Sequence, residues 1–169
     1  GERVREKGVG ATIMSGEKRP RSASAPTRSS EPPAAIQRIV ALSRYYGRDP
    51  EWVIAGGGNT STKSDATLWV KASGTALETV TAESFVALDR RRLSQMWSKE
   101  YPREVESREA EALTDLMAAR HDGETLRPSV ETGMHDAIPH TYVVHTHPTL
   151  INGLTCARDG RKTVEELFG

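Results

Sequence analysis

A stripe of mainly apolar residues at helical spacing follows Pro32 and Pro33. The residues of this stripe are Ile36, Ile39, Val40 and Tyr46, with the small polar Ser43 at the same spacing. Proline is favoured in the first turn of a helix, and glycine is favoured directly after the last one. The pattern therefore predicts a helix that begins at Pro32-Pro33 and ends at Gly47.

Short runs of apolar, β-branched and aromatic residues predict strands further along the chain. The predicted strands cover residues 52–55, 67–72, 85–89 and 141–145. A polar turn at Lys63-Ser64-Asp65 lies between the first two of these runs, which is typical of a β-hairpin.

Three further segments have helical character. Residues 104–121 have high helix propensity, a short helix after Glu131 ends before Pro139, and residues 150–157 form the last one. The apolar stripe of the longest segment consists of Val105, Leu113, Leu116 and Met117. Mixed helices and strands with a hairpin favour a layered α/β domain with a mainly antiparallel sheet over a doubly wound fold.

The chain of 169 residues has room for one domain, preceded by a segment of different composition. Residues 1–31 are rich in Arg, Lys, Ser, Gly and Pro and almost lack large apolar side chains. Such a segment does not bury enough apolar surface to offset its conformational entropy, so we expect a disordered tail. A role of this tail as a nucleic-acid-binding or targeting arm stays open.

Charge and cysteine content exclude several classes of partner. The 23 basic and 23 acidic residues balance, which argues against nucleic acid or an anionic membrane as a partner. No apolar run approaches the roughly 18 residues of a membrane span, and the charged N-terminus does not look like a secretory signal. With a single cysteine, Cys156, there is no internal disulfide, so we expect a cytoplasmic protein.

His145 and His147 occupy alternate positions at the end of a predicted apolar strand. Residues i and i+2 of a strand point to the same face, so the two rings can converge on one metal ion. Thr146 points the other way, and Pro148 ends the strand. A catalytic zinc usually takes three protein ligands, so the pair alone is also compatible with ordinary histidines.

Glu131 precedes this strand and lies in a Pro-Ser-Val-Glu turn. A carboxylate near a divalent cation can act as a general base, although a carboxylate in the first helical turn also simply stabilises the helix. His135 follows four residues later on the same helical face, where we favour a packing or hydrogen-bonding role over metal ligation. His121 and His140 are interpreted as structural.

Small and polar residues form three candidate anion-binding turns at Gly56–Ser61, at Ser73–Thr75 and at Ser129. Glycine permits close backbone approach, and Asn, Ser and Thr add hydrogen-bond donors. Each turn alone is also compatible with a plain connection. The pattern is neither the dinucleotide-binding motif nor the P-loop.

Taken in order, these motifs resemble those of a known family. They read Gly57-Gly58-Asn59-Thr60-Ser61, Lys71-Ala72-Ser73-Gly74-Thr75, Pro128-Ser129-Val130-Glu131 and His145-Thr146-His147-Pro148. The combination resembles the class II aldolase/adducin family from about residue 36 to the C-terminus. Within it, the chain is most similar to the aldolase half of bifunctional rhamnulose-1-phosphate aldolase/short-chain dehydrogenase proteins.

The resemblance implies a fold and a site. The fold would be a three-layer α/β/α sandwich with a mainly antiparallel central sheet. His145 and His147 would be two of three histidine ligands of Zn²⁺ or another divalent metal, and Glu131 would be the acid/base carboxylate. The residues that would bind the substrate phosphate are Gly58, Asn59, Ser73, Gly74 and Ser129.

The resemblance also implies an activity and its alternatives. The protein would be a metal-dependent lyase that cleaves a sugar or a ketose 1-phosphate by retro-aldol chemistry, as a homo-oligomer, commonly a tetramer. A sugar-phosphate epimerase or dehydratase of the same fold, a non-catalytic adducin-like binding module and an inactive fragment are the alternatives.

Two positions depart from the family pattern. Val130 stands where phosphate-using members often have a second serine. In the family the third histidine ligand lies well beyond His147, and no histidine follows it in these 169 residues. We therefore expect residues 32–169 to be the N-terminal part of the family's domain, truncated at its C-terminal end, with two of the three histidine ligands.

Overall fold

The computed structural model describes residues 34–169, in which a four-stranded antiparallel sheet has the order β3-β2-β1-β4. The expected tail of residues 1–31 lies outside the described residues, as do Pro32 and Pro33. The elements in chain order are α1 (Ala34–Gly47), β1 (Asn59–Lys63), β2 (Thr67–Lys71), η1 (Leu77–Thr79), η2 (Ala82–Ser84), β3 (Phe85–Asp89), α2 (Arg90–Trp97), α3 (Val105–Ala118), α4 (Thr132–Ala137), β4 (Tyr142–His145), α5 (Thr149–Cys156) and α6 (Gly160–Phe168).

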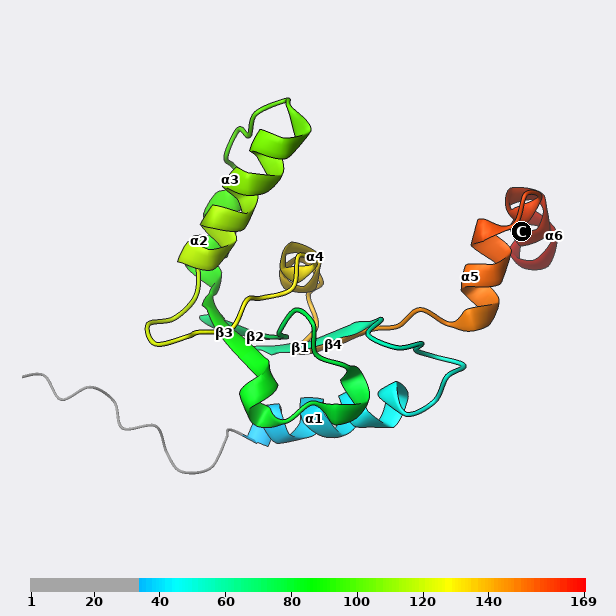
Figure 1. Cartoon of the computed structure of the whole chain (residues 1–169), viewed down its shortest axis with the longest axis horizontal. Helices are drawn as coiled ribbons and strands as arrows, with labels where there is room; N and C mark the ends of the chain where they lie inside the picture. The colour runs from blue at the N-terminus through cyan, green and yellow to red at the C-terminus, as the bar shows by residue number, and fades with distance from the viewer. Residues whose placement is uncertain (1–33) are drawn as a thin grey trace, which may run out of the picture. The chain divides into compact units, whose positions relative to one another are not determined.

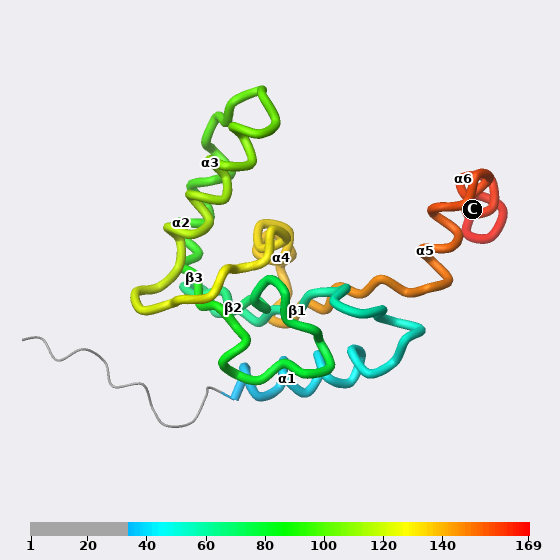
Figure 2. Tube along the Cα trace, in the orientation of Figure 1, coloured from blue at the N-terminus to red at the C-terminus, as the bar shows by residue number. Residues whose placement is uncertain are grey.

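Helices cover both faces of the sheet. Helix α1 contacts β1 and β4 together with the short η1 and η2 turns, whereas α2 and α4 contact β3, β2 and β1 from the other side. Figure 1 shows α1 along one face and α2, α3 and α4 beyond the opposite face, and the Cα trace in Figure 2 follows the same course. The three-layer α/β/α arrangement expected from the sequence is confirmed.

The alternation of side chains along β2 and β3 divides the apolar core between the two faces. On one face, strand residues pack against α2 and α3; this cluster consists of Leu68, Val70, Ala72, Val86, Leu88, Leu93, Leu116 and Ala119. On the other face, Ile39 of α1 packs with Val80 and Phe85. Both clusters bury apolar surface against strands β2 and β3, so the apolar core lies on both sides of these two strands.

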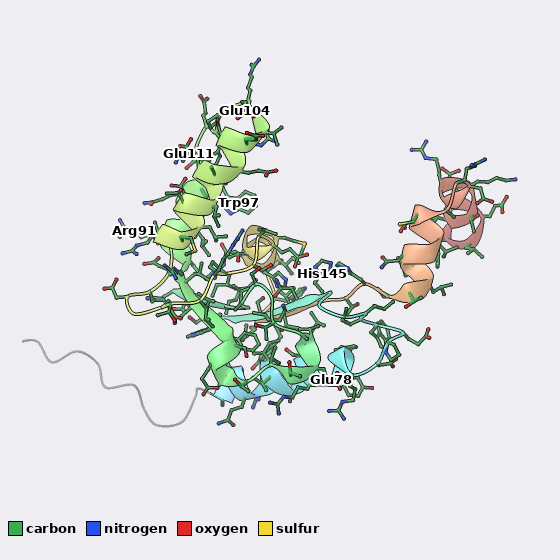
Figure 3. The ribbon with its side chains drawn as sticks, in the orientation of Figure 1. Glu78, Arg91, Trp97, Glu104, Glu111 and His145 are labelled. Atoms are coloured by element: carbon green, nitrogen blue, oxygen red, sulfur yellow. The ribbon has the colours of Figure 1, made fainter. Side chains whose placement is uncertain are left out.

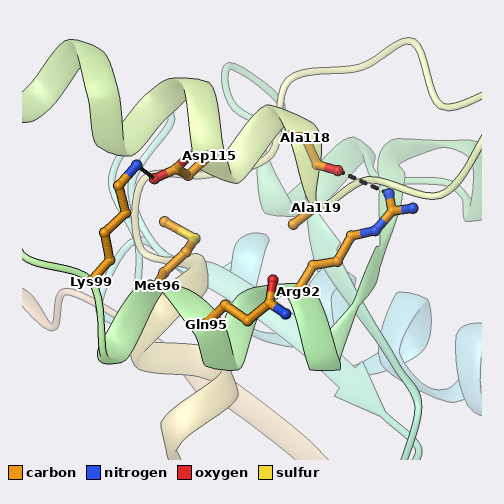
Figure 4. A pocket seen from close by; sticks show the side chains of 7 residues that line it. All are labelled: Arg92, Gln95, Met96, Lys99, Asp115, Ala118 and Ala119. Carbon is orange, nitrogen blue, oxygen red and sulfur yellow. Dashed lines mark hydrogen bonds and ion pairs between the residues drawn. The ribbon is translucent and has the colours of Figure 1, made fainter.

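Helices α2 and α3 lie side by side and are joined by polar contacts at both ends of their interface. Nη1 of Arg92 donates to the Ala118 carbonyl at 3.0 Å, and Nζ of Lys99 lies 2.5 Å from a carboxylate oxygen of Asp115 (Figure 4). Met96 lies between these contacts and packs against the apolar cluster. The pair therefore covers one face of the sheet as a unit.

The central strand β1 is buried along its whole length although its sequence, Asn-Thr-Ser-Thr-Lys, is polar. Towards α1, the Thr60 hydroxyl lies 2.7 Å from the Ser43 hydroxyl. Towards α4, Nζ of Lys63 donates to the carbonyl groups of His135 and Ile138. Buried polar groups are tolerated where they are hydrogen-bonded, and these bonds tie β1 to the helices on both faces.

The prediction of a strand at residues 52–55 is wrong. These residues form turns, Ile54 is 59% exposed, and Ala55 has a φ of 53°, which a strand does not accommodate. The strand instead begins at Asn59, inside the segment predicted as a loop. The predicted hairpin exists, but its first strand is β1, which pairs with β2 through Ser61 and Val70.

Most of the other expected elements are confirmed. Helices α1, α3, α4 and α5 and strands β2, β3 and β4 lie where the sequence places them. In the stripe of α3, however, Val105 is exposed and only Leu116 is buried. The sequence analysis did not predict α2 and α6. Helix α2 begins where the Asp89 side chain accepts from two backbone N–H groups, but it buries only Leu93, so its apolar stripe is weak.

Replacement of Leu68 by alanine tests the cluster between the sheet and the α2–α3 pair. Leu68 is fully buried in it, so we expect Leu68→Ala to lower the free energy of unfolding by about 2–5 kcal/mol. Leu150→Ala, at an exposed position of α5, is the matched control and should change it by less than about 0.5 kcal/mol. Urea denaturation measures both, and similar losses would contradict this placement of the core.

Candidate metal centre

The candidate site lies where the first residue of β1, the last residue of β4 and the start of α4 meet. Asn59 and His145 are register partners in the sheet, and Glu131 immediately precedes α4. Nδ2 of Asn59 donates to Oε2 of Glu131 at 3.1 Å, and Nδ1 of His145 lies 3.1 Å from Oε1. Both carboxylate oxygens therefore have a neighbour, and the three side chains form one cluster at the end of β4. Figure 3 labels His145, the β4 member of this cluster.

His145 and His147 converge as the sequence predicts. Their rings lie 4.7 Å apart between centroids, and the two Nε2 atoms are separated by 3.1 Å. Two imidazole nitrogens bound to one tetrahedral zinc ion at about 2.0–2.1 Å would lie roughly 3.3 Å apart. The pair is thus close to the spacing that such an ion requires.

His135 comes closer to the centre than expected. It is fully buried, with 0% of its surface exposed, and its Nδ1 lies 2.8 Å from the Ser61 hydroxyl of β1. This contact agrees with the expected hydrogen-bonding role. Burial lowers the pKa of His135 to about 4, so the ring is neutral at physiological pH.

The group of residues that could hold an ion differs in part from the predicted pair. Donor atoms of Glu131, His135 and His145 lie within 4.8 Å of one another, whereas the ligands predicted from the sequence are His145 and His147. Nitrogen and carboxylate oxygen donors in this combination suit zinc and similar divalent ions. Nε2 of His135 is buried without a hydrogen-bond partner in the described part of the chain, which also fits a cation-binding site.

Gly57 and Gly58, in the loop before β1, leave room for the histidines of this cluster. Gly58 has a φ of 75°, and a Cβ atom there would lie 2.8 Å from the His145 carbonyl oxygen. At Gly57 a Cβ would lie 3.6 Å from Nδ1 of His147. Glycine is therefore required at position 58 by backbone conformation and by the close approach of β4.

The other two predicted loops lie against each other. The backbone N–H of Ser73 donates to the Arg127 carbonyl at 2.9 Å, and Ala72 forms a β-bridge with Pro128. Ser129 is buried, and its hydroxyl accepts from the backbone N–H of Glu131 at 3.2 Å. The structure thus joins the serine turns to the segment that carries Glu131.

Sequence reasoning did not single out Lys71, which is buried at this junction. Its Nζ donates to the carbonyl groups of Thr75 at 2.6 Å and Ala72 at 3.3 Å. Burial lowers the pKa of Lys71, and the negative charge of Glu131 acts in the opposite direction. The available signal was a lysine inside an otherwise apolar strand, since a buried lysine needs polar partners.

The fold and this set of donors are those of a class II aldolase-type α/β/α domain. The family model of the class II aldolase and adducin N-terminal domain matches residues 37–167. The chain belongs to this family.

Two similar proteins extend the comparison. A solved structure of the N-terminal class II aldolase domain of a conserved protein from Thermoplasma acidophilum matches with a TM-score of 0.64 and 26% identity, over 88% of this chain and 69% of that one. The protein named uncharacterized oxidoreductase YuxG of Bacillus subtilis is 29% identical over 151 residues, which cover 84% of this chain. The chain spans only 21% of the length of that relative.

Among residues 34–169, no helix is both long and apolar enough to cross a bilayer.

Replacing Gly58 and Gly74 by alanine, one at a time, distinguishes the cost of a positive φ from the cost of a collision between the new Cβ and neighbouring backbone. Both glycines have positive φ, which costs other residues about 1–2 kcal/mol. Only the Cβ at position 58 would also collide with backbone, since the space at Gly74 is open. We expect Gly58→Ala to destabilise the protein more than Gly74→Ala in urea denaturation; equal losses would show that β4 does not approach the loop closely.

Proposed function

We propose that this domain is a metal-dependent aldolase that cleaves a sugar or a ketose 1-phosphate by retro-aldol chemistry. The observation that carries the proposal is the approach of one carboxylate, Glu131, to a pair of converging histidines, His145 and His147. Membership of the class II aldolase/adducin family supports the same reaction class.

His145 and His147 would hold the ion, Zn²⁺ or another divalent metal, through the Nε2 atoms that lie 3.1 Å apart. When bound, such an ion supplies Lewis-acid chemistry that stabilises negative charge on a carbonyl oxygen. The two rings face each other at this distance, which limits the reorganisation that binding requires.

Glu131 would carry the proton. Its Oε2 accepts from Asn59, and its Oε1 faces His145, so the carboxylate is held from both sides. In its protonated form this carboxyl group would give a proton to the carbon left by bond cleavage, while the substrate hydroxyl that becomes the aldehyde loses one, so the protons balance. In its ionised form it would remove a proton from the same carbon in the condensation direction. Asn59 orients the group, and its neutral amide adds no competing charge.

The substrate would be held by the polar turns around this centre. Its phosphate would be bound by Gly58, Asn59, Ser73, Gly74 and Ser129. Ser73 and Gly74 are exposed and adjoin the 127–129 segment, which supports a shared binding surface. Val130, where phosphate-using members often have a second serine, is 75% exposed and brings no donor to it.

The domain would work as part of a longer protein. Since it spans 21% of a relative named as an oxidoreductase, we propose that it is the N-terminal part of the aldolase half of a bifunctional aldolase/dehydrogenase. We further propose a cytoplasmic homo-oligomer with a small sugar or sugar phosphate as its partner.

Replacement of Glu131 by glutamine tests the acid/base role. With dihydroxyacetone phosphate in D₂O and saturating zinc, we expect Glu131→Gln to slow exchange of the reacting C–H proton by about 10²–10⁴-fold. NMR measures the exchange, and the metal content should stay that of the unsubstituted protein. Glu100→Gln, at an exposed position, is the matched control and should exchange normally.

Exchange at an unchanged rate in Glu131→Gln would remove Glu131 from the mechanism. A zinc-loaded, folded protein that catalyses neither exchange nor cleavage would favour a non-catalytic adducin-like module. Exchange accompanied by inversion at a sugar carbon without cleavage would favour an epimerase.

A further inference from the structure

One carbonyl group at the end of α4 finds its partner outside the helix. In an α-helix each carbonyl accepts from the N–H group four residues later, and the residue four after His135 is Pro139, which has no N–H. Lys63 supplies the missing donor: its Nζ donates to the carbonyl of His135 and, at 2.6 Å, to that of Ile138. A buried side chain of the central strand β1 therefore completes the end of this helix.

Helix α4 depends on such support because it is short. It has only six residues, Thr132–Ala137, and helices of this length are not stable by themselves. The residue at its N-cap position, Glu131, does not cap it through the side chain, since the carboxylate faces Asn59 and His145 instead. The position of α4 is therefore set by its bonds to the strand that it covers.

Lys63 is itself fixed on both sides of its strand. Its backbone N–H donates to the Thr141 carbonyl at 2.9 Å, and the backbone N–H of the next residue, Ser64, donates to the Thr67 carbonyl at 2.9 Å. Burial lowers the pKa of Lys63, and the negative charge of Asp136 in α4 acts in the opposite direction. Asp136 thus favours the ammonium form, whose positive charge suits the C-terminal end of a helix.

We propose that Lys63 is a positioning residue for proton transfer by Glu131: it anchors the C-terminal end of α4 to β1 and so fixes the place of the carboxylate at the other end. A helix of about two turns moves as one body, so a shift at one end is passed to the other. This inference rests on the acid/base role of Glu131 in the proposed function. It adds a residue that touches neither the substrate nor the metal.

Small displacements are sufficient for such an effect. Proton transfer needs the carboxylate within hydrogen-bond reach of the proton that moves, and a misplacement of about 1 Å can slow a reaction about 100-fold. Glu131 and His135, whose carbonyl Lys63 binds, are four residues apart in sequence, which is about 6 Å along a helix axis. The anchor therefore lies close enough to the carboxylate to pass on a shift of this size.

Amide hydrogen exchange, followed by NMR, tests the anchor independently of activity. The backbone N–H of His135 donates to the Glu131 carbonyl at 3.1 Å. Lys63→Met keeps the length of the side chain without the ammonium group, and we expect this N–H to exchange about 10-fold faster relative to the amides of β2. Ser43→Ala is the matched control, since it removes a hydroxyl 2.7 Å from that of Thr60 in the same strand, on the α1 face, and should leave α4 protected.

Proton exchange of dihydroxyacetone phosphate in D₂O, with saturating zinc, tests the effect on Glu131. We expect Lys63→Met to lower kcat for exchange by about 10–100-fold, whereas KM, zinc affinity and the kcat of Ser43→Ala stay close to those of the unsubstituted protein. In the Glu131→Gln background, Lys63→Met should cause no further loss, since a residue that acts only through this carboxylate has no effect once it is gone. Lys63→Gln, which also removes the charge, is a second variant with the same expected changes in case Lys63→Met does not fold.

The outcomes separate this inference from the proposed function. Unchanged protection of α4 in the folded Lys63 variants, or an unchanged kcat despite a loosened α4, would overturn the role of Lys63 and leave the aldolase proposal standing. An equal loss of kcat in the Glu131→Gln background would do the same. Absence of exchange activity in the unsubstituted protein would overturn the proposed reaction, and the protection of α4 would still decide whether Lys63 anchors the helix.

Discussion

The polar side chains of the central strand are the constraint on which the site depends. Asn59, Ser61 and Lys63 alternate along β1 and point to the face that α4 covers. A buried polar side chain is costly unless it has a partner. The partners all come from one short segment: the Glu131 carboxylate, the His135 ring and the carbonyl groups of His135 and Ile138. Satisfying the strand therefore also brings together the carboxylate and imidazole donors of the site.

The apolar core acts on the site indirectly. Its two clusters pack β2 and β3 against helices on both faces. The hydrogen bonds of the sheet then set the position of β1 next to β2, and of β4 next to β1. At the end of β4 the chain comes so near to Gly58 that no side chain fits there. The packed core fixes the sheet, and the close approach of Gly58 to the His145 carbonyl fixes the end of β4. His145 and His147 then lie within hydrogen-bonding distance of each other.

Sequence patterns succeeded where periodicity and local chemistry agree, as in the stripe of α1 and in the apolar run that leads to His145. They failed at residues 52–63, because the apolar run Trp52–Ala55 is exposed except at Val53, whereas the polar run Asn59–Lys63 is buried. No local rule identifies such a strand, since its burial depends on partners some 70 residues away, such as His135, which lies 74 residues beyond Ser61. For the same reason, His135 could be placed on a helical face with Glu131 but not beside His145.

The sequence by itself determined which donors exist and which of them are neighbours along the chain. The alternate positions of His145 and His147 are a local property of an extended backbone, and so is the helical spacing of Glu131 and His135. Only the tertiary structure decided that the histidine pair meets Glu131 and His135. Strand β1 pairs with β4 and is hydrogen-bonded to both Glu131 and His135, so it holds the two segments together. The physical reason is that hydrogen bonds of buried polar groups, which join distant segments, set the geometry of this centre, whereas hydrophobic periodicity determines only the elements that carry it.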